Sequence, residues 1–413
     1  MNKVSGNNFG SAEQELVKQL QGSGDELALN MLKKHGLPTR RLEAYHYTDL
    51  KLLLSKVPQL AEKNQASSKK IDAAIDIPGA LQIVLENGSA PELPALPNNI
   101  AVSKNSGSSL KERDDIIVAL NRSLVTKSLH FKFSGTTDQV LHLDWRNSAI
   151  NDSAAHVLAS VSLELEPGAT ATIIETFSGS NHEHLANFGS AIIIGNGASL
   201  THIVVDLTSK KSTRLHTIEY EIGANTKLHN LLINSGSKLS RTQVFSNFLG
   251  EGAVGEYSGL NLVGDGQHCD ITLDTIHAVP NTISNQKFKV VAKNSAKAIF
   301  QGRISVKPIA QKTDAKMMVQ GLMLSEGAQI LNKPELEIFA DDVQCGHGST
   351  CGELDEDTLF YLMSRGIARE DASSMLIRAF VQELLDPISD EGVNKALSDI
   401  VEKWLENTQD SVV

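Results

Sequence analysis

The chain has 413 residues, which is enough for one large domain or for two or three smaller ones. Its formal net charge of −11 argues against a general binder of nucleic acid or of anionic membranes. Hydrophobic residues make up 41% of the chain, aromatic residues only 5%, and there are 30 glycines. This composition favours short stacked strands with tight turns over a large helical core.

The cysteines and the N-terminal sequence bear on the compartment. Three cysteines, Cys269, Cys345 and Cys351, are too few and too odd in number for a disulfide framework. The N-terminal segment has no apolar stretch typical of a secretory signal, and no run approaches the roughly 18 apolar residues that cross a bilayer. We therefore expect a protein of the reducing cytosol that binds neither membranes nor nucleic acids.

The N-terminal region, residues 1–110, is predicted to be helical and then irregular. Ser11 and Asp25 can each cap a short helix, and the first 60 residues carry apolar side chains at helical spacing. Residues 55–110 are less regular, and they include the proline-rich run APELPALPNN, which cannot be a central strand.

Apolar residues alternate with period two from about residue 116 to residue 345. Each repeat consists of an alternating stretch, a Gly/Ala turn and a second alternating stretch. Aligning these turns places six alanines in equivalent positions: Ala169, Ala198, Ala224, Ala253, Ala296 and Ala328. Their spacings of about 29, 26, 29, 43 and 32 residues predict a β-solenoid core over residues 111–352, whose stacked coils share one core. The hairpins of a β-sandwich are the alternative.

The C-terminal region, residues 353–413, returns to helical periodicity. Asp355 can cap a helix that ends at Gly366, and two further amphipathic helices are predicted at about residues 368–385 and around Val393 to Leu405. The region holds 14 acidic and 5 basic residues, which is −9 of the net charge. We expect these helices to close the end of the solenoid and to offer a docking surface for a basic partner, unless the charges are merely solvated.

One segment carries candidate ligands for a soft metal. Cys345 and His347 are two residues apart after an alternating strand, so an extended backbone would place both side chains on one face, roughly 6.5–7 Å apart. Thiolate and imidazole suit iron–sulfur clusters and zinc, but two ligands do not close a tetrahedral site. Another segment or chain would have to contribute. A small buried thiol beside a turn histidine is the alternative, and the spacing assigns no role to Cys351.

Motifs for common enzyme chemistry are missing. The sequence has no phosphate-binding G-x-x-x-x-G-K-[ST] loop, so the chain should not hydrolyse ATP by that route, and it has no H-E-x-x-H, G-x-S-x-G or C-x-x-C motif. Asp270 and Asp274 would lie on one strand face, where a β-helix polysaccharide lyase could use paired carboxylates. Such enzymes are generally exported, which makes this a weak alternative.

Two segments resemble a known family. Residues 332–366, with KPELEI-ADDV-C-HG followed by G-LD-D-LFYL-SRGI, resemble the shared C-terminal signature of the SufB/SufD family of iron–sulfur assembly proteins. GLPTRRLEAYHYTDL, residues 36–50, resembles the G-P-x-x-x-x-E-x-W/Y-x-YT-L segment of the SufD branch, which the chain length also favours. The resemblance spans nearly the whole chain. It implies a mainly β protein with a right-handed parallel β-helix core between helical terminal regions.

The resemblance also implies partners. Members of the family act as non-catalytic scaffolds, in which a SufD-like chain pairs with a SufB-like paralogue and each binds a copy of the SufC-like ABC ATPase. The last coils would pair edge to edge with the paralogue, and the helices after Glu353 would bind the ATPase. The candidate docking residues for the ATPase are Leu359, Tyr361, Leu362, Arg365, Leu376 and Phe380.

Cys345 and His347 match the Cys-x-His positions of the family near the heterodimer interface. The resemblance implies that they form or hold a transient iron–sulfur cluster together with residues of the SufB-like subunit, with no cofactor permanently bound. In the alternative, the chain is a structural adaptor and the cluster chemistry is confined to the paralogue. A homodimer of isolated chains through the same strand edge also stays open.

Overall fold

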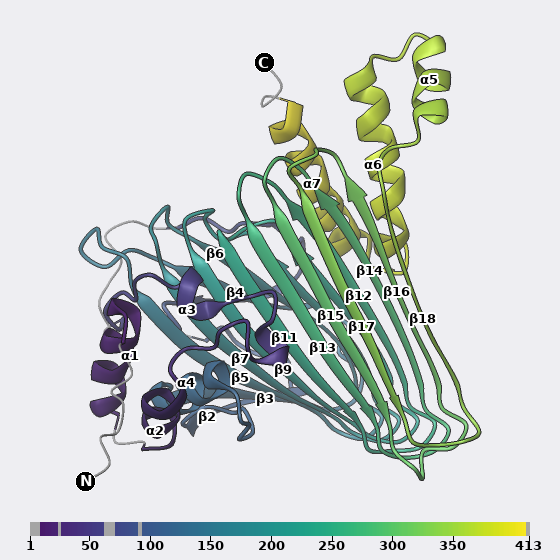
Figure 1. Cartoon of the computed structure of the whole chain (residues 1–413). Coiled ribbons are helices and arrows are strands. Elements are labelled where there is room, and N and C mark those ends of the chain that lie inside the picture. The colour runs from purple at the N-terminus through teal and green to yellow at the C-terminus, as the bar shows by residue number, and fades with distance from the viewer. Residues whose placement is uncertain (1–8, 24–25, 62–70, 90–92, 410–413) are drawn as a thin grey trace.

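The computed structural model describes residues 9–23, 26–61, 71–89 and 93–409, the side chains of residues 407–409 excepted. Two long sheets face each other and form a parallel β-solenoid of about eight turns (Figure 1). In each coil the chain passes from one sheet to the other and back, and the main hydrophobic core lies between the sheets. The predicted parallel solenoid is therefore confirmed, and the β-sandwich is wrong.

The two sheets have nine strands each among the described residues. Sheet I contains, in spatial order, β1 (Leu81–Glu86), β4 (Leu141–Asn147), β6 (Thr170–Gly179), β8 (Ser199–Asp206), β10 (Lys227–Asn234), β12 (Val254–Val263), β14 (Ile283–Ala292), β16 (Asp314–Met323) and β18 (Gln344–Gly352). Sheet II contains β2 (Ile100–Ser106), β3 (Lys127–Phe133), β5 (His156–Leu165), β7 (Leu185–Ile194), β9 (Thr213–Ile222), β11 (Leu239–Phe248), β13 (His268–His277), β15 (Lys297–Val306) and β17 (Gln329–Ile338). Neighbouring strands run parallel, except that β2 and β3 are antiparallel.

One row of corner residues shows the length of each coil. The N–H of the first residue of a sheet I strand donates to the carbonyl of the corner residue one coil before, as from Ser199 to Ala169 (2.8 Å) and from Ile283 to Ala253 (2.9 Å). The row consists of Ala169, Ala198, Thr226, Ala253, Thr282 and Thr313. Successive members are 27–31 residues apart, so the predicted period near 30 is confirmed.

Three of the six predicted alanine positions are wrong. Thr226, not Ala224, occupies the corner position of its coil. Ala296 and Ala328 lie at the opposite corner, where the chain passes from sheet I to sheet II. A tight turn followed by a small residue suits both corners, so the alignment changed corner after Ala253. The irregular interval of 43 residues therefore covers about one and a half coils.

A helix stands where the alternating pattern was expected to begin. α4 (Ile116–Leu124) is capped by the Asp115 carboxylate, which accepts hydrogen bonds from the N–H groups of Ile117 (2.9 Å) and Val118 (3.1 Å). It packs between the N-terminal helices and sheet II, so it is buried on most sides. A short run that is apolar on all sides has no period that separates helix from strand, which explains the error.

The N-terminal helices cover part of the outer face of sheet II (Figure 1). They are α1 (Ser11–Gln21), α2 (Glu26–His35), a 3-10 helix η1 (Glu43–Tyr45) and α3 (Leu50–Leu53). Together with α4 they share a second core with Leu185, Leu215 and Leu239 at the starts of three sheet II strands. The N-terminal helices are confirmed, while β1 and β2 already belong to the sheets before residue 111.

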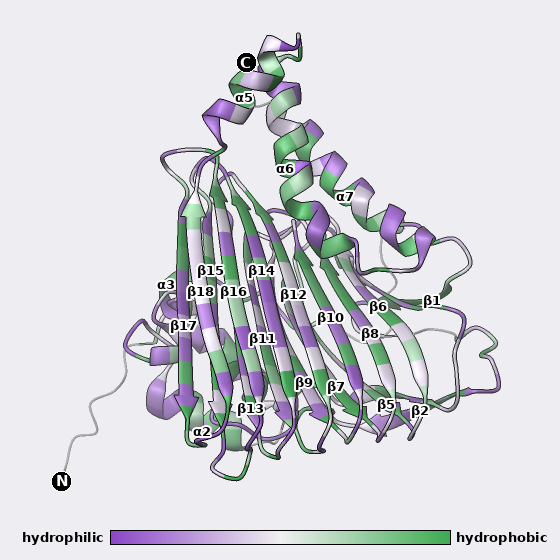
Figure 2. Cartoon of the chain, turned by 90° about the vertical axis from the view of Figure 1, so that its right-hand side faces the viewer, coloured by the Kyte–Doolittle hydropathy of each residue, from purple (hydrophilic) through white to green (hydrophobic). Residues whose placement is uncertain are grey.

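The three predicted C-terminal helices are confirmed, but their expected position is wrong. α5 (Glu356–Ser364) begins after Asp355, whose carboxylate accepts from the N–H of Thr358 (2.9 Å), and α6 (Arg369–Leu385) and α7 (Glu391–Gln409) follow. α6 and α7 lie along the outer face of sheet I instead of closing the last coil (Figure 2). They cover outward-facing residues such as Leu231 and Leu260, which would otherwise be exposed. None of the described helices is long and apolar enough to cross a membrane.

Candidate functional site

The last coil, formed by β17 and β18, ends the solenoid with two free strand edges. Within the described part of the chain, β17 pairs only with β15, and β18 only with β16. Both strands lie at the edge of the molecule, and most residues of β18 are exposed (Figure 2). Free edges of this kind are templates for pairing with a strand of another chain.

The two free edges differ in the donors they offer. The N–H of Gln344 donates to the carbonyl of Thr313 (2.8 Å), so in β18 the odd-numbered residues direct their N–H groups to the free edge. In β17 the N–H of Gln329 bonds to Ala296 (2.9 Å), so the even-numbered residues face outward there. Pro334 is one of them, and it has no N–H to give. The free edge of β18 therefore has an unbroken row of N–H donors, whereas that of β17 lacks the donor at Pro334.

Cys345 and His347 lie on the face of β18 that continues the interior of the solenoid. The register pairs Cys345 with Ala315 and His347 with Met317, both of which are buried in the main core. Ser349 is next in the row, and its hydroxyl accepts a hydrogen bond from Asn332 of β17 (2.9 Å). The row therefore points between the two sheets, at the open end.

The two candidate ligands differ in their surroundings. Cys345 is partly buried and packs against the main core, whereas His347 is exposed. Burial raises the pKa of the Cys345 thiol; the N–H of Ala315 opposes this effect and the Asp314 carboxylate adds to it. The thiol is therefore protonated at neutral pH in the chain alone.

Cys351 belongs to the same row but cannot share an ion with Cys345. Six residues of strand separate the two, a distance of about 20 Å. Its sulfur lies close to Gly321, and burial raises the pKa of its thiol as well. No group of three or more Cys, His, Asp or Glu side chains suited to a metal occurs in the described parts of the chain. Cys345 and His347 thus form a two-ligand half-site.

The predicted docking residues are divided between surface and interior. Leu359 is buried, and Leu362, Leu376 and Phe380 are partly buried, with Lys289 placed over the Phe380 ring. Tyr361 and Arg365 are exposed and contact each other through a hydrogen bond of 3.2 Å. Only part of the set is thus available to a partner.

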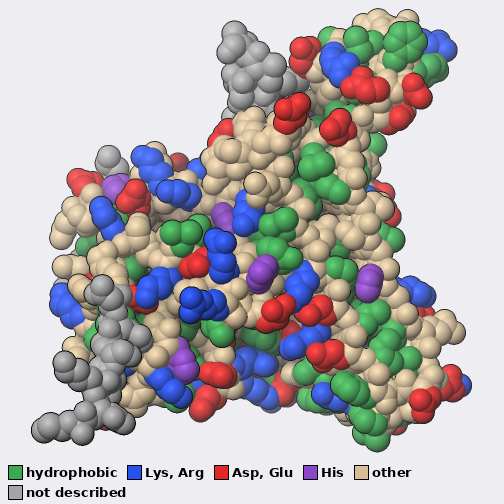
Figure 3. All heavy atoms as spheres, viewed as in Figure 1, with side chains coloured by type: hydrophobic (Ala, Val, Ile, Leu, Met, Phe, Trp, Pro, Cys, Tyr) green, Lys and Arg blue, Asp and Glu red, His purple; other side chains and the backbone are tan. Residues whose placement is uncertain are grey.

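The sequence interpretation did not single out the most exposed aromatic residue of the helical module. Phe360 of α5 is 74% exposed, and exposed Tyr361 and Met363 lie on the same helix. α5 projects beyond the solenoid, and hydrophobic and acidic side chains are mixed at its tip (Figures 1 and 3). The triplet Leu359-Phe360-Tyr361 was the available signal, since successive apolar residues on a helix cannot all face the core.

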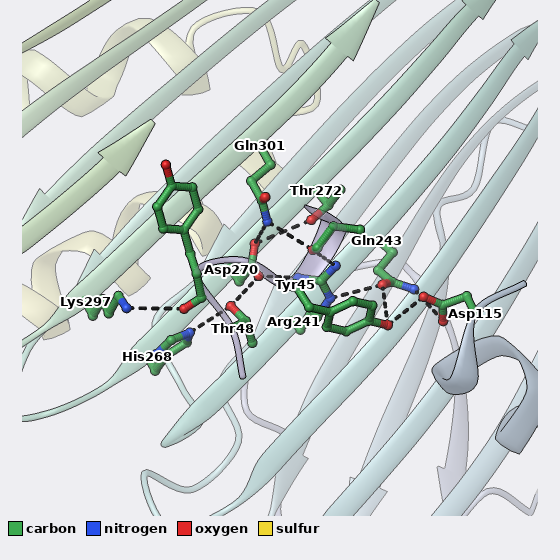
Figure 4. A network of polar contacts seen from close by, with 12 residues as sticks. Tyr45, Thr48, Asp115, Arg241, Gln243, His268, Asp270, Thr272, Lys297 and Gln301 are labelled. Atoms are coloured by element: carbon green, nitrogen blue, oxygen red, sulfur yellow. Dashed lines mark hydrogen bonds and ion pairs between the residues drawn. The ribbon is translucent and has the colours of Figure 1, made fainter. Parts of the chain in front are cut away.

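The segment from Gly36 to Leu50 docks on the outer face of sheet II through a buried polar network (Figure 4). The Arg241 guanidinium lies over the Tyr45 ring, 4.1 Å from its centroid, and pairs with the Asp270 carboxylate. The Thr48 hydroxyl donates to Asp270 (2.5 Å), and the Tyr45 hydroxyl donates to Asp115 (2.5 Å). Tyr45 and Thr48 of this sequence motif therefore anchor the segment to sheet II.

Ion pairs also engage the two aspartates considered for carbohydrate chemistry. Asp270 is fully buried and held by Arg241 and Thr48, and Asp274 pairs with Arg303 (2.5 Å). Each carboxylate is engaged by a cation, so the pair does not form an open acid and base. The geometry gives no support to a lyase.

Comparison with known proteins identifies the family of the chain. The profile described as "SUF system FeS cluster assembly, SufBD core domain" matches residues 148–380, a range that includes Cys345 and His347. The chain belongs to the SufB/SufD family. The iron–sulfur cluster assembly protein SufD of Escherichia coli is 28% identical over 387 residues, which cover 89% of each chain. A SufBD family protein of Synechocystis is 28% identical over 413 residues, with 92% of this chain and 89% of that protein covered. SufD of Bacillus subtilis is 31% identical over 261 residues, covering 61% of this chain and 58% of its own.

Proposed function

We propose that this chain is a non-catalytic scaffold subunit that assembles iron–sulfur clusters together with a SufB-like paralogue and a SufC-like ATPase. The observation that carries the proposal is the open last coil, where a Cys-x-His half-site points between two free strand edges. Family membership supports the role in the SUF system. The cluster is cargo, held only in passing, and ATP hydrolysis belongs to the partner.

The paralogue would complete the last coil by strand pairing. β18 offers an outward N–H at Cys345, His347, Ser349 and Cys351, so a partner strand would bond directly beside the half-site. A Cβ built on Gly346 would meet no atom within 4 Å, so the face of β18 opposite the half-site is also open at that position. The missing ligands would then come from the second subunit.

The state of the Cys345 thiol fits a site that is active only in the complex. Binding iron or sulfide-bridged iron requires the thiolate and a neutral imidazole. Burial raises the pKa of Cys345 in this chain, so the thiol is a poor ligand by itself. A cationic group or a metal ion brought by the partner would lower the pKa of the thiol.

The ATPase would bind at the projecting end of the helical module. Exposed Phe360 and Tyr361 provide apolar anchors, in the manner of aromatic residues at other interfaces. A groove of about 510 Å³ lies beneath α5 and α6, and Glu326, Glu353 and Glu370 are among the residues that line it. The groove would accept a basic side chain of the partner.

Co-purification of three co-expressed proteins tests the partner assignment. We expect the tagged chain to retain both a SufB-like paralogue and a SufC-like ATPase. Deleting residues 353–413 is unsuitable as a test, because it would expose Leu231 and Leu260 of sheet I. The double change Phe360→Ser and Tyr361→Ser should instead remove the ATPase and retain the paralogue.

The matched control for this double change is Leu52→Ser, which alters an equally exposed apolar residue on α3, outside the helical module. It should retain both partners. A chain that binds neither partner when all three are present would contradict the proposal. Binding of both partners with unchanged cluster yield in half-site variants would instead favour the structural adaptor.

A further inference from the structure

A core position on the sheet II side of the last coil is left uncovered. Inward-facing residues at the ends of five successive sheet II strands lie in one register row: Ile222, Phe248, His277, Val306 and Ile338. The first four are fully buried, because the next coil lies over each of them. Ile338 ends β17 and is 41% exposed. A position that belongs to the core in every earlier coil of the row is therefore surface in the last one.

The chain covers the other end of the solenoid itself. Ile83 and Leu85 of β1 are buried, although β1 is an edge strand. Leu93 and Leu96, in the connection between β1 and β2, pack against the same core. Among the described residues, no segment covers Ile338 in this way. Because the terminal coils of a solenoid need a cap for solubility, the uncovered core position indicates that another molecule completes the last coil.

Two more apolar side chains are exposed at the same corner of the solenoid. Phe339 follows Ile338, is 59% exposed, and its N–H donates to the carbonyl of Val306 (3.0 Å). Ile309 lies in the turn between β15 and β16, one coil earlier, and is 67% exposed. Hydrophobic side chains gather at the lower right of Figure 3, where the turns of the last coils lie in Figure 1. We call Ile309, Ile338 and Phe339 the corner patch.

Side-chain contacts are needed on this side, because the backbone of β17 offers an interrupted edge. Pro334 stands in the middle of the row of outward-facing even-numbered residues and has no N–H. A strand of another chain could not form a continuous ladder there. β18 begins at Gln344, a short turn after Ile338, so the corner patch is continuous with the unbroken edge of β18. One partner can therefore contact both.

We propose that a terminal coil of the SufB-like paralogue covers the corner patch. β18 is then recognised by backbone hydrogen bonds, and the sheet II side by apolar packing. A coil is the fitting occupant, because in each earlier coil of the row the following coil covers the residue equivalent to Ile338. The inference rests on the proposed function and adds a second contact surface to that interface. Strand pairing alone could slip along the edge, and the corner patch would fix its register beside Cys345.

Calorimetric titration of the full-length chain with the purified paralogue tests the proposal. The double change Ile338→Thr and Phe339→Thr should weaken binding by about tenfold to a hundredfold, because it removes two apolar side chains but keeps residues that suit a strand. Ile309→Ser alters an exposed turn, so it should weaken binding without disturbing the folding of β17. Both variants should still bind the SufC-like ATPase, since α5 lies at the other end of the strands (Figure 1).

Leu249→Thr is the matched control, because Leu249 is an exposed apolar residue at the same corner, three coils before Phe339. It should leave the affinity for the paralogue unchanged. Equal affinity of the wild type and both corner-patch variants would overturn the inference and leave the proposed function standing. A wild type that does not bind the paralogue would overturn both. A homodimer that the double change abolishes, with paralogue binding unchanged, would assign the corner patch to a second copy and also overturn the inference.

Discussion

At the scale of single residues, the N-terminal motif is explained by one buried cation. Arg241 of β11 pairs with Asp270 one coil later, lies over Tyr45 and donates to the carbonyl of Ala44 (2.8 Å). The motif thus acts at a distance of almost 200 residues along the chain. The motif attaches the N-terminal segment to sheet II. No local sequence pattern predicts this attachment.

Arg241→Met should lower the free energy of unfolding by about 3–5 kcal/mol, because it leaves the Asp270 carboxylate buried without its cation. Denaturant unfolding measures the loss. The matched control is Arg303→Met, which removes the partly exposed partner of Asp274 and should cost less than about 1 kcal/mol. Equal losses in the two variants would show that the buried pair does not anchor the segment.

Buried histidines should make the protein sensitive to acid. Burial lowers the pKa of His156 and His216 to about 3, and that of His184, His268 and His277 to about 4, from the usual 6.5. The unfolded chain therefore binds more protons than the folded chain between these values. The contribution of these histidines to the free energy of unfolding is fully present above pH 6.5, and it is lost as the pH falls from 6.5 towards 3.

One histidine isolates this effect. His156 is fully buried, and its Nδ1 lies 2.7 Å from the amide oxygen of Gln19. Because of His156, the free energy of unfolding should be about 2 kcal/mol lower at pH 5 than at pH 7. Unfolding free energies of His156→Gln should therefore fall less steeply between these pH values than those of the wild type. Parallel curves for the two proteins would show that this histidine does not contribute.

At the scale of secondary-structure elements, β18 combines the half-site with a pairing edge. The odd-numbered residues present their side chains to the interior and their backbone N–H groups to the free edge. The candidate ligands and the free N–H groups therefore belong to the same residues, because both follow from the alternation of the strand. A partner that pairs with this edge necessarily lies beside Cys345 and His347.

Ser349→Pro should prevent pairing with the paralogue. The substitution removes an outward N–H that β16 does not use, so the chain's own ladder stays intact. Ser349→Ala is the control, since it removes the hydroxyl that accepts from Asn332 but keeps the N–H. Analytical ultracentrifugation of the mixed subunits should show the complex with Ser349→Ala and not with Ser349→Pro. A normal complex with both would mean that pairing uses another surface.

The sequence predicted the strand alternation, the period near 30 residues and the helix cap at Asp355, because each depends on near neighbours. The cap predicted at Ser11 is wrong, because α1 begins at Ser11 and Gly10 is its N-cap, and the cap predicted at Asp25 lies outside the described residues.

The sequence interpretation misplaced Ala296 and Ala328, because the two corners of a coil use similar turns. It also misplaced α6 and α7, although Ile203, Val204 and Val205 are consecutive apolar residues. Such a run indicates a strand buried on both faces, so it was the signal that a helix covers sheet I.

At the scale of the whole molecule, the helices lie on the outer faces of the two sheets and leave the last coil open. The N-terminal helices cover part of sheet II, and α6 and α7 cover part of sheet I. Force applied by an ATPase at α5 would pass through α6 to β12 and β14, which it contacts. In the proposed scaffold role, this helical layer would connect the docking end with β12 and β14, which belong to the same sheet as β18 and are separated from it by β16.

The most direct test counts iron and sulfide in the anaerobically purified complex of this chain with the SufB-like paralogue and the SufC-like ATPase. His347→Ala should leave the three subunits together and lower both counts by about tenfold, because the half-site loses one of its two ligands. Thr350→Ala, an exposed change on the opposite face of β18, should leave both counts normal. Normal iron and sulfide in the His347→Ala complex would contradict the account.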